Sequence, residues 1–415
     1  MKKFYFIFLA PLFLGAQNLE ELVNLSIQNK LVDSSQKSLD SIKDEYKSVK
    51  SGYLPSLDVG ANHAITNKET ASVPKNSSKA YATLSYELYD GGKKSDVYDS
   101  YESSIKSSTE SINSLKNDIS LDVINHYYNY LSYISQKDAK IKEIEQLDSQ
   151  LTRLSRFLDA GTTTEDEVQK IISRLENAKV TLQEIELEMI TIIHNLEYIT
   201  GQQITIDEGS SIKELENDTQ NDLRFDLKSL EYDLETKLAN SRSEKSAYLP
   251  SITLDNTYTH YDKNYDGDFS SDPDNQNILS ATLKWNLFSF GETKYKYESK
   301  YKDYLSLKSK YEYEKNRANV DLQLALKSYD IAKLKIKSSE ANLKAATTTY
   351  DVIKSKYENG LIDNVAFLES LSEKFTALSQ LKTSLNDLEI KKAKILYHSG
   401  KKLEEYIKWE NQYLQ

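Results

Sequence analysis

The sequence predicts a mainly α-helical protein that also carries β-strands of membrane-spanning length, built as two tandem copies of one plan. A proline phrase occurs twice, as YLPSLD from Tyr53 and as YLPSIT from Tyr248. Three pairs of glycines are each separated by 199 residues: Gly92 and Gly291, Gly161 and Gly360, and Gly201 and Gly400. Because repeated spacing marks internal duplication, we expect a first repeat over 17–201, a linker over 202–221 and a second repeat over 222–415.

The N-terminal residues MKKFYFIFLAPLFLGAQ predict a secretory signal peptide over 1–16, because two lysines precede a short apolar run and a small-residue cleavage site. That run is too short for a membrane-spanning helix. The formal net charge of -11 is unfavourable for a nucleic-acid partner. The chain has no cysteine, which excludes disulfides, thiol nucleophiles, cysteine-ligated zinc and an N-terminal lipid anchor.

Each repeat contains a long stretch that predicts a single helix. Sixty-eight residues without glycine or proline follow Gly92, and the same number follow Gly291. We therefore expect long helical hairpins over 92–201 and 291–400. Their turns are expected at Gly161 and Gly360, which suit the left-handed position after a last helical turn.

The return helix of the first hairpin shows apolar residues at alternating steps of three and four. These residues are Val168, Ile171, Leu175, Ala178, Leu182, Ile185, Met189, Ile192, Leu196 and Ile199. Such a heptad seam packs against another helix by knobs-into-holes contacts. Thr164 and Glu167 are expected to form a capping box at its start. Shorter helices are predicted over about 18–50 and 222–246 and at the C-terminus.

The residues that follow each proline phrase alternate between apolar and polar, which predicts β-hairpins over 55–90 and 250–290. Strands of about ten residues with one apolar face have the length needed to cross a membrane. The residue before a proline disfavours helical geometry, so Pro55 and Pro250 mark a switch from helix to strand. Tyr53 and Tyr248 are then expected at a membrane interface.

Four strands are too few to close a membrane barrel, which needs about eight. Open strand edges in lipid would leave backbone groups unpaired, so these strands require further copies of the chain. Three copies would supply twelve strands. The predicted helices, at about 1.5 Å per residue, would each reach roughly 100 Å and could pack side by side.

The signal peptide, the doubled order of helix, YLPS, hairpin and long helix, and the turns LYDGG and LFSFG resemble the TolC-type outer membrane efflux proteins. The resemblance covers essentially the whole mature chain. It implies a homotrimeric channel-tunnel, with a 12-stranded β-barrel in the outer membrane and a long α-helical coiled-coil barrel extending into the periplasm. It also implies a periplasmic adaptor (membrane fusion) protein and an inner-membrane pump of the RND or ABC type, working in efflux or type I secretion.

The resemblance also points to residues at the two hairpin turns. In the family, a tyrosine, an arginine and two acidic residues of the second turn constrict the periplasmic mouth. By distance from the glycine, the tyrosine falls on Tyr357 and one acid on Glu369, whereas the arginine and the other acid fall on Ile362 and Ala366. The sequence therefore departs from the family pattern at two of these four positions.

In the family, an acidic residue of the first turn partners that arginine, and it falls here on Glu167. Because position 362 is isoleucine, the family's latch cannot form in the same way, and Asp363 is a candidate for the missing negative charge. Gly161 and Gly360 are expected to lie where an adaptor docks. On a threefold axis, one glutamate becomes a ring of three carboxylates, and such rings set cation preference in pores.

Each of these residues also has a purely structural interpretation. Glu167 could be a helix cap, Asp363 an N-cap before Asn364, Glu369 a solvated carboxylate and Tyr357 a packing residue. The motifs G-x-S-x-G, H-E-x-x-H and the phosphate loop are absent, so we expect no enzyme, metal or cofactor. The alternative function is an exported coiled-coil structural or adhesive protein without a pore, which would leave the two membrane-length hairpins unexplained.

Overall fold

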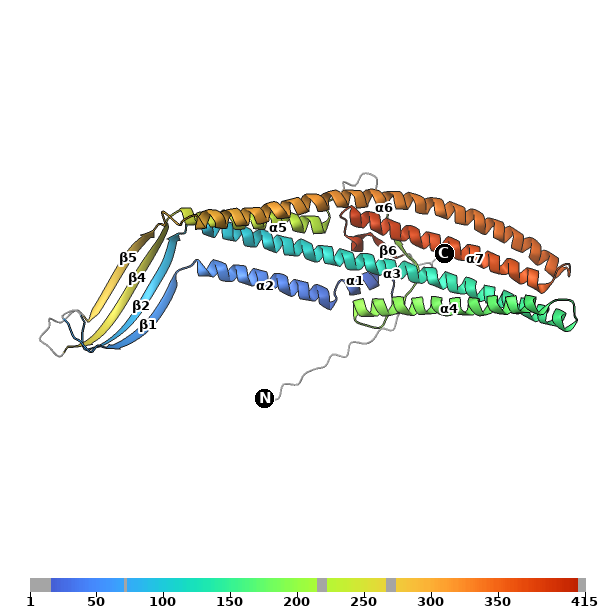
Figure 1. The fold of residues 1–415 in the computed structure, drawn as a ribbon, viewed down its shortest axis with the longest axis horizontal. Coiled ribbons are helices and arrows are strands. Elements are labelled where there is room, and N and C mark those ends of the chain that lie inside the picture. The colour runs from blue at the N-terminus through green and yellow to red at the C-terminus, as the bar shows by residue number, and fades with distance from the viewer. Residues whose placement is uncertain (1–15, 71–72, 215–221, 266–273, 410–415) are drawn as a thin grey trace. The chain divides into compact units, whose positions relative to one another are not determined.

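The structure, a computed structural model, describes residues 16–70, 73–214, 222–265 and 274–409 (Figure 1). The predicted signal peptide, apart from Ala16, and residues 215–221 of the predicted linker lie outside these ranges. The first repeat holds α1 (Leu19–Ser26), α2 (Lys30–Gly52), β1 (Ser56–Ile65), β2 (Asn76–Tyr89), α3 (Lys93–Asp159) and α4 (Glu165–Thr200). After it follow β3 (Ser210–Ile212), α5 (Phe225–Ser243), η1 (Glu244–Tyr248), β4 (Ser251–Asn264), β5 (Asn275–Lys284), α6 (Glu292–Glu358), α7 (Asn364–His398), η2 (Leu403–Tyr406) and β6 (Ile407–Trp409).

The chain divides into two compact units, and each unit takes residues from both repeats. The helical unit comprises Met1–Asp33, Asn113–Arg224 and Asn316–Gln415. The sheet unit comprises Ser34–Ile112 and Phe225–Lys315. The helices α3 and α6, of 67 residues each, contribute to both units. The equal lengths agree with the predicted duplication.

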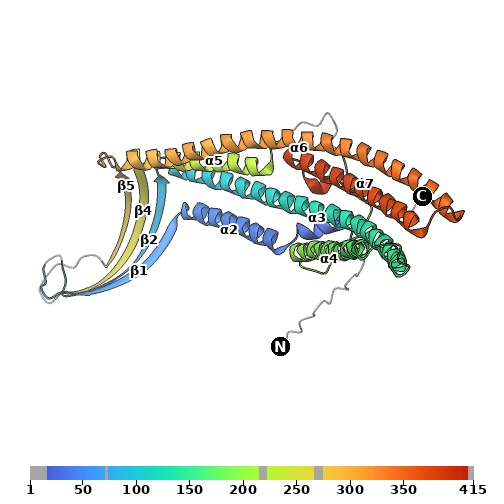
Figure 2. The same ribbon diagram turned by 45° about the vertical axis from the view of Figure 1, so that its right-hand side comes forward.

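The sheet unit contains an antiparallel sheet of four strands in the order β1-β2-β4-β5 (Figure 1 and Figure 2). One face is largely apolar, and Leu57 lies opposite Leu84 on it while Ile252 lies opposite Leu283. The other face is polar, with the hydroxyls of Thr83 and Thr257 3.0 Å apart. The register therefore gives the sheet the two contrasting faces that the alternation predicts.

Helix gives way to strand at both proline phrases. In the first, the amide of Leu54 donates to the carbonyl of Ser51 at 3.0 Å before β1 begins beyond Pro55. In the second, Leu249 is already extended, with φ -107° and ψ 157°, and β4 begins immediately after Pro250. The Tyr53 ring packs edge-on against Tyr98 at 5.6 Å, so this side chain contacts α3.

The helices of the sheet unit associate through polar contacts as well as apolar ones. Hydroxyls on α3 donate to α5, from Ser103 to Glu235 at 3.0 Å and from Ser107 to Asp233 at 2.6 Å. Nearer the sheet, Arg242 binds Asp96 at 2.8 Å. Buried polar groups are stable only when their hydrogen bonds are satisfied, so these pairs fix the alignment of α5 along α3.

The core of the helical unit centres on two tyrosines of α3. Tyr127 and Tyr128 are fully buried, and their hydroxyls donate to the carbonyls of Asp207 and Ser210 at 2.8 Å and 3.0 Å. Burial raises the pKa of both phenols. Among the described residues, the fully buried large side chains also include Leu19, Leu22, Val23, Val123, Ile124, Leu147, Leu196, Leu396 and Leu403. The start of β3 and the segment before it are thus each held to the core by one hydrogen bond.

The predicted heptad seam of α4 is confirmed. Its buried residues are Val168, Ile171, Leu175, Ala178, Ile185, Ile192 and Leu196. Leu175 and Ala178 form a cluster with Leu147 of α3, flanked by Ile144 and Leu151. In both views α4 lies along the second half of α3, and α7 lies along α6 (Figure 1 and Figure 2).

Two sequence predictions about the ends of the helical unit are wrong. The single helix expected over about 18–50 is broken after Ser26, because the side chain of Asn29 accepts from the amides of Leu31 and Val32 at 3.0 Å and starts a new helix. The expected C-terminal helix is replaced, within the described residues, by the short turn η2 and by β6. That strand pairs with β3, so the backbone hydrogen bonds run between segments almost 200 residues apart.

Candidate functional site

The two hairpin turns of the helical unit have the same backbone geometry. Gly161 and Gly360 have φ values of 68° and 70°. The amides of Gly161 and Thr162 donate to the carbonyls of Leu158 and Phe157 at 2.9 Å and 2.8 Å. The second turn repeats this pattern around Gly360, with bonds of 2.9 Å and 2.8 Å. This is the Schellman ending of a helix, in which glycine adopts the left-handed conformation without steric cost.

The start of α4 does not contain the predicted capping box. Thr164 occupies the N-cap position with extended φ and ψ, but its side chain makes no capping hydrogen bond. Glu167 instead accepts from Lys170 at 2.6 Å. A hydrogen bond from Thr164 lowers the pKa of Asp166, and the lysine contributes to the same effect. The Thr164 side chain thus bonds to Asp166 and the Glu167 carboxylate to Lys170, so the capping box does not form.

The start of α7 is capped by Asp363, as the structural interpretation of this residue predicts. Its carboxylate accepts from the amide of Ala366 at 2.9 Å. The same carboxylate forms an ion pair with Arg153 of α3. Beside it, the side-chain nitrogen Nδ2 of Asn364 donates to the hydroxyl of Ser149 at 3.0 Å. The negative charge of Asp363 is therefore used within the chain, to join α7 to α3.

Arg153 was missed by the sequence analysis. The guanidinium lies 5.1 Å from the ring centroid of Phe157, one turn further along α3. Ser149, Arg153 and Phe157 are spaced four residues apart, so they lie on one face of a helix. That spacing indicates a shared helix face, but the local sequence does not show which helix this face contacts.

The remaining predicted residues of the turns lie apart from this ion pair. The Tyr357 ring stacks on Phe367 at 4.8 Å, in agreement with a packing role, while 38% of the residue remains exposed. Glu369 is exposed on α7, and Ile362 and Ala366 are half-buried. The structure thus brings Asp363 to Arg153 and Tyr357 to Phe367. The pore roles of Tyr357, Asp363, Glu369 and Glu167 stay predictions.

Replacing Asp363 with alanine is expected to destabilise the helical unit by about 1 kcal/mol, because the cap of α7 is lost. The variant Asp363→Asn keeps a capping side chain and removes only the charge. Since both partners of the ion pair are partly exposed, that variant should cost less than about 1 kcal/mol. Urea unfolding followed by circular dichroism would compare them. Equal losses in the two variants would assign the stabilisation to the ion pair and contradict the capping role.

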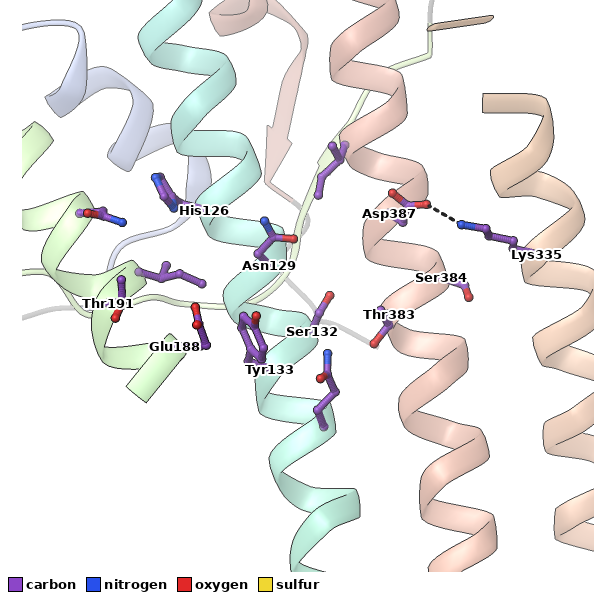
Figure 3. Close-up of a pocket in the computed structure, with 14 residues that line it drawn as sticks. His126, Asn129, Ser132, Tyr133, Glu188, Thr191, Lys335, Thr383, Ser384 and Asp387 are labelled. Carbon is purple, nitrogen blue, oxygen red and sulfur yellow. Dashed lines mark ion pairs between the residues drawn. The ribbon is translucent and has the colours of Figure 1, made fainter. Parts of the chain in front are cut away.

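A polar cavity of about 550 Å³ lies elsewhere in the helical unit, among α3, α4, α6 and α7 (Figure 3). It is lined by His126, Asn129, Ser132, Tyr133, Gln136, Glu188, Thr191, Ile192, Asn195, Lys335, Thr383, Ser384, Asp387 and Ile390. In its lining, Asp387 of α7 and Lys335 of the neighbouring α6 form an ion pair at 3.8 Å (Figure 3). Burial lowers the pKa of His126, so this side chain is biased toward its neutral form. The lining can hydrogen-bond water and other polar molecules.

Within the described ranges, no group of three or more histidine, aspartate or glutamate side chains is arranged to hold a metal ion. None of the helices described is both long and apolar enough to cross a membrane.

Comparison with known proteins identifies the class. The model of the outer membrane efflux protein family matches residues 22–202 and 220–396, which is most of the chain and one match per repeat. The chain belongs to the outer membrane efflux protein family. It is therefore a non-enzymatic channel protein of the outer membrane that extends into the periplasm. Channels of this class are trimers that work with adaptor and pump partners. No curated protein sequence matches the chain significantly.

Solved structures share the fold at low sequence identity. A membrane protein from Pseudomonas aeruginosa has a TM-score of 0.77 and 16% identity, over 92% of this chain and 93% of that one. The outer membrane protein VceC from Vibrio cholerae has a TM-score of 0.75 and 13% identity, over 93% and 96%. The CmeC outer membrane channel of Campylobacter jejuni has a TM-score of 0.75 and 17% identity, over 92% and 85%. The predicted tandem channel-tunnel fold is confirmed.

Proposed function

We propose that three copies of this chain form the passive exit duct of a tripartite efflux or type I secretion system. The observation that carries this proposal is the open sheet of the sheet unit. In the part of the chain that the structure describes, β1 and β5 each pair on one side only, and one face of the sheet is apolar. Strand edges in lipid need partners, and three such sheets supply more than the roughly eight strands of the smallest membrane barrels.

The helical unit supports the same assembly. Both α4 and α6 carry apolar side chains that remain exposed at steps of three, four or seven residues. They are Val180, Leu187 and Ile190 on α4, and Val320, Leu324, Ile331 and Leu334 on α6. Exposed seams with this spacing suit packing against helices of a second copy. The homotrimer would bury them.

The hairpin turns are the proposed contact points for partners. We place the periplasmic aperture at Tyr357, Asp363, Glu369 and Glu167, and adaptor docking at the turns around Gly161 and Gly360. Leu361, beside the second turn, is 74% exposed, which leaves an apolar side chain available to an adaptor. A periplasmic adaptor and an inner-membrane pump of the RND or ABC type would supply the substrate and the energy.

The decisive experiment combines mass and conductance. The mature protein, purified in detergent, is expected to have the mass of three chains and to produce discrete, long-lived current steps in a planar lipid bilayer. A monomer, or a trimer that stays silent after the turns are loosened by substitution at Gly161 and Gly360, would instead favour the coiled-coil structural or adhesive protein without a pore.

Replacing Glu369 with glutamine is expected to reduce the cation preference of the channel, by about twofold or more, because three carboxylates leave the mouth together. Reversal potentials in a salt gradient measure this preference. The control is Glu340→Gln, which removes the same charge from an exposed position on α6. An equal change in both variants, or none in either, would remove Glu369 from the aperture.

A further inference from the structure

A lysine lies over a tyrosine ring where the helices of the sheet unit adjoin the sheet, and this pair occurs once in each repeat (Figure 1). The ammonium nitrogen of Lys50 lies 5.4 Å from the ring centroid of Tyr98, and that of Lys245 lies 4.6 Å from the ring centroid of Tyr297. The lysines are 195 residues apart, like the proline phrases, and the tyrosines are 199 residues apart, like the glycine pairs. The cation–π pair therefore belongs to the duplicated plan.

Each pair joins the segment before a proline phrase to the start of a long helix. Lys50 lies near the end of α2 and Lys245 lies in η1, while Tyr98 and Tyr297 lie in the second turn of α3 and of α6. Both lysines are exposed, whereas both tyrosines are half-buried. The rings are thus held by the fold, and each lysine presents its charge to the surroundings.

The charges of the two lysines are not neutralised by the chain. In the part of the sequence that the structure describes, neither lysine forms an ion pair with a carboxylate. Glu102 accepts from the hydroxyl of Tyr46 at 2.6 Å, so this carboxylate is already bonded beside Lys50, which lies 4.1 Å from the Tyr46 centroid. Glu244 precedes Lys245, but successive side chains of a 3-10 helix point about 120° apart. Each pair therefore leaves a positive charge available to an anion from outside the chain.

The first repeat adds a second cation to its pair. The ammonium nitrogen of Lys94 lies 5.8 Å from the Tyr98 centroid and 5.5 Å from that of Tyr53. The carboxylate of Asp90 accepts from the amides of Gly92 and Lys94 at 3.0 Å and 2.6 Å, so it serves the backbone at the start of α3. Two lysines thus border one ring, an arrangement that can share one anion.

The pairs lie at the depth expected for lipid headgroups. Four residues after each lysine comes an exposed leucine, Leu54 at 63% and Leu249 at 48%, and the strand begins directly after the next residue, proline. Four residues of helix or 3-10 helix rise about 6–8 Å. The polar layer on each side of a bilayer's hydrocarbon core is about 5–8 Å thick. When the leucines lie at the edge of the core, the lysines therefore reach the layer that contains the lipid phosphates.

Tryptophan and tyrosine mark the same level in the second repeat. Trp285 follows two residues after Leu283 of the apolar face, is 54% exposed, and donates its indole N–H to the carbonyl of Tyr248 at 3.0 Å. Lys245 and Tyr248 are three residues apart in η1, which places them on the same side of this 3-10 helix. Lys245 thus lies one turn from two residues of the types that favour membrane interfaces.

We propose that Lys50 and Lys245, together with Lys94, bind the phosphate groups of anionic phospholipids in the periplasmic leaflet of the outer membrane. Lysine binds phosphate as a point charge, and the tyrosine ring beneath it fixes where that charge lies. In a trimer the pairs repeat around the barrel and hold a ring of lipid at its periplasmic end. This inference rests on the sheet crossing the outer membrane, as the proposed duct requires, and it is independent of cargo, adaptor and pump.

Lipid retention by the purified protein tests this proposal. The trimer is exchanged into mixed micelles that contain phosphatidylglycerol and phosphatidylethanolamine in equal amounts, repurified, and its retained lipids are counted by mass spectrometry. The unmodified protein should retain phosphatidylglycerol in excess. Lys50→Gln with Lys245→Gln should lower that excess by about fivefold or more, because a lysine at an anionic lipid surface contributes about 1 kcal/mol. Lys50→Arg with Lys245→Arg keeps both charges and should keep the excess.

The matched control is Lys327→Gln with Lys344→Gln, which removes two charges from exposed positions on α6 in the helical unit and should leave the excess unchanged. Equal retention of phosphatidylglycerol by the unmodified protein and by the Lys50→Gln, Lys245→Gln variant would overturn the proposal. Displacement of phosphatidylglycerol by inorganic phosphate at equal concentration would assign the lysines to free phosphate and overturn the lipid site.

The remaining outcomes separate this inference from the proposed function. If the glutamine variant dissociates to monomers equally in both lipids, the lysines serve contacts between chains, and the lipid site is overturned. Unmodified trimers that conduct but retain the two lipids equally would overturn only this inference. Unmodified chains that neither form trimers nor conduct would overturn the proposed function itself.

Discussion

Replacing Tyr128 with alanine is expected to lower the free energy of unfolding by about 3–5 kcal/mol, the range for removing a large aromatic side chain from a packed core. Tyr128 is only 2% exposed, and its hydroxyl fastens the carbonyl of Ser210. The loss therefore combines a cavity in the core with an unsatisfied carbonyl at the first residue of the β3–β6 pair. Equilibrium urea unfolding of the detergent-solubilised protein, followed by far-ultraviolet circular dichroism, measures it.

The matched control is Tyr130→Ala, on the same helix and half-buried. It should cost about 1 kcal/mol, the typical value for a single substitution. If the two variants unfold at the same urea concentration with the same slope, the tyrosine pair does not form the core of the helical unit.

Replacing Gly400 with alanine is expected to lower the free energy of unfolding by about 2–5 kcal/mol, which is the second large effect. Its φ of 72° costs an alanine about 1–2 kcal/mol. A Cβ atom would in addition lie 2.6 Å from the carbonyl oxygen of Asp222 and 2.9 Å from that of Leu223. Both atoms belong to backbone, so relieving the overlap requires a backbone shift that costs about 1–3 kcal/mol more.

The first repeat supplies the control, because Gly201 is the counterpart of Gly400. It has φ 75°, but a Cβ atom there would meet nothing within 4 Å. Gly201→Ala should therefore cost only about 1–2 kcal/mol, from the backbone conformation alone. If Gly400→Ala were as stable as Gly201→Ala, residues 222–223 would move to accommodate the Cβ atom without a further loss of stability. That result would contradict the packing argument.

The duplication made much of the fold predictable. Glycines at equal spacing mark helix ends, and the paired positions share nearly the same φ: 68° and 70° at Gly161 and Gly360, and 75° and 72° at Gly201 and Gly400. Local chemistry dictates these ends, because only glycine adopts that conformation without steric cost. The alternation of apolar and polar residues that predicts the strands also depends only on local sequence, since successive side chains on a strand point to opposite faces.

The errors arose where partners distant in sequence decide the outcome. The β3–β6 pair joins residues 210–212 to 407–409, and neither segment has a signal of its own at three residues. The ion pair of Asp363 depends on Arg153 of another helix. At the start of α4, Lys170 draws Glu167 away from the cap that the motif predicts. In each case the deciding contact is tertiary or electrostatic, and the spacing of residues along the sequence does not predict it.

The unpaired outer edges of β1 and β5 have a consequence for biogenesis. A newly exported chain presents two bare strand edges and an apolar sheet face before it meets its partners, and such surfaces template aggregation. The interval between export and assembly is therefore the vulnerable stage in the life of this protein. A factor that shields β1 and β5 during that interval is therefore expected to raise the yield of finished channels.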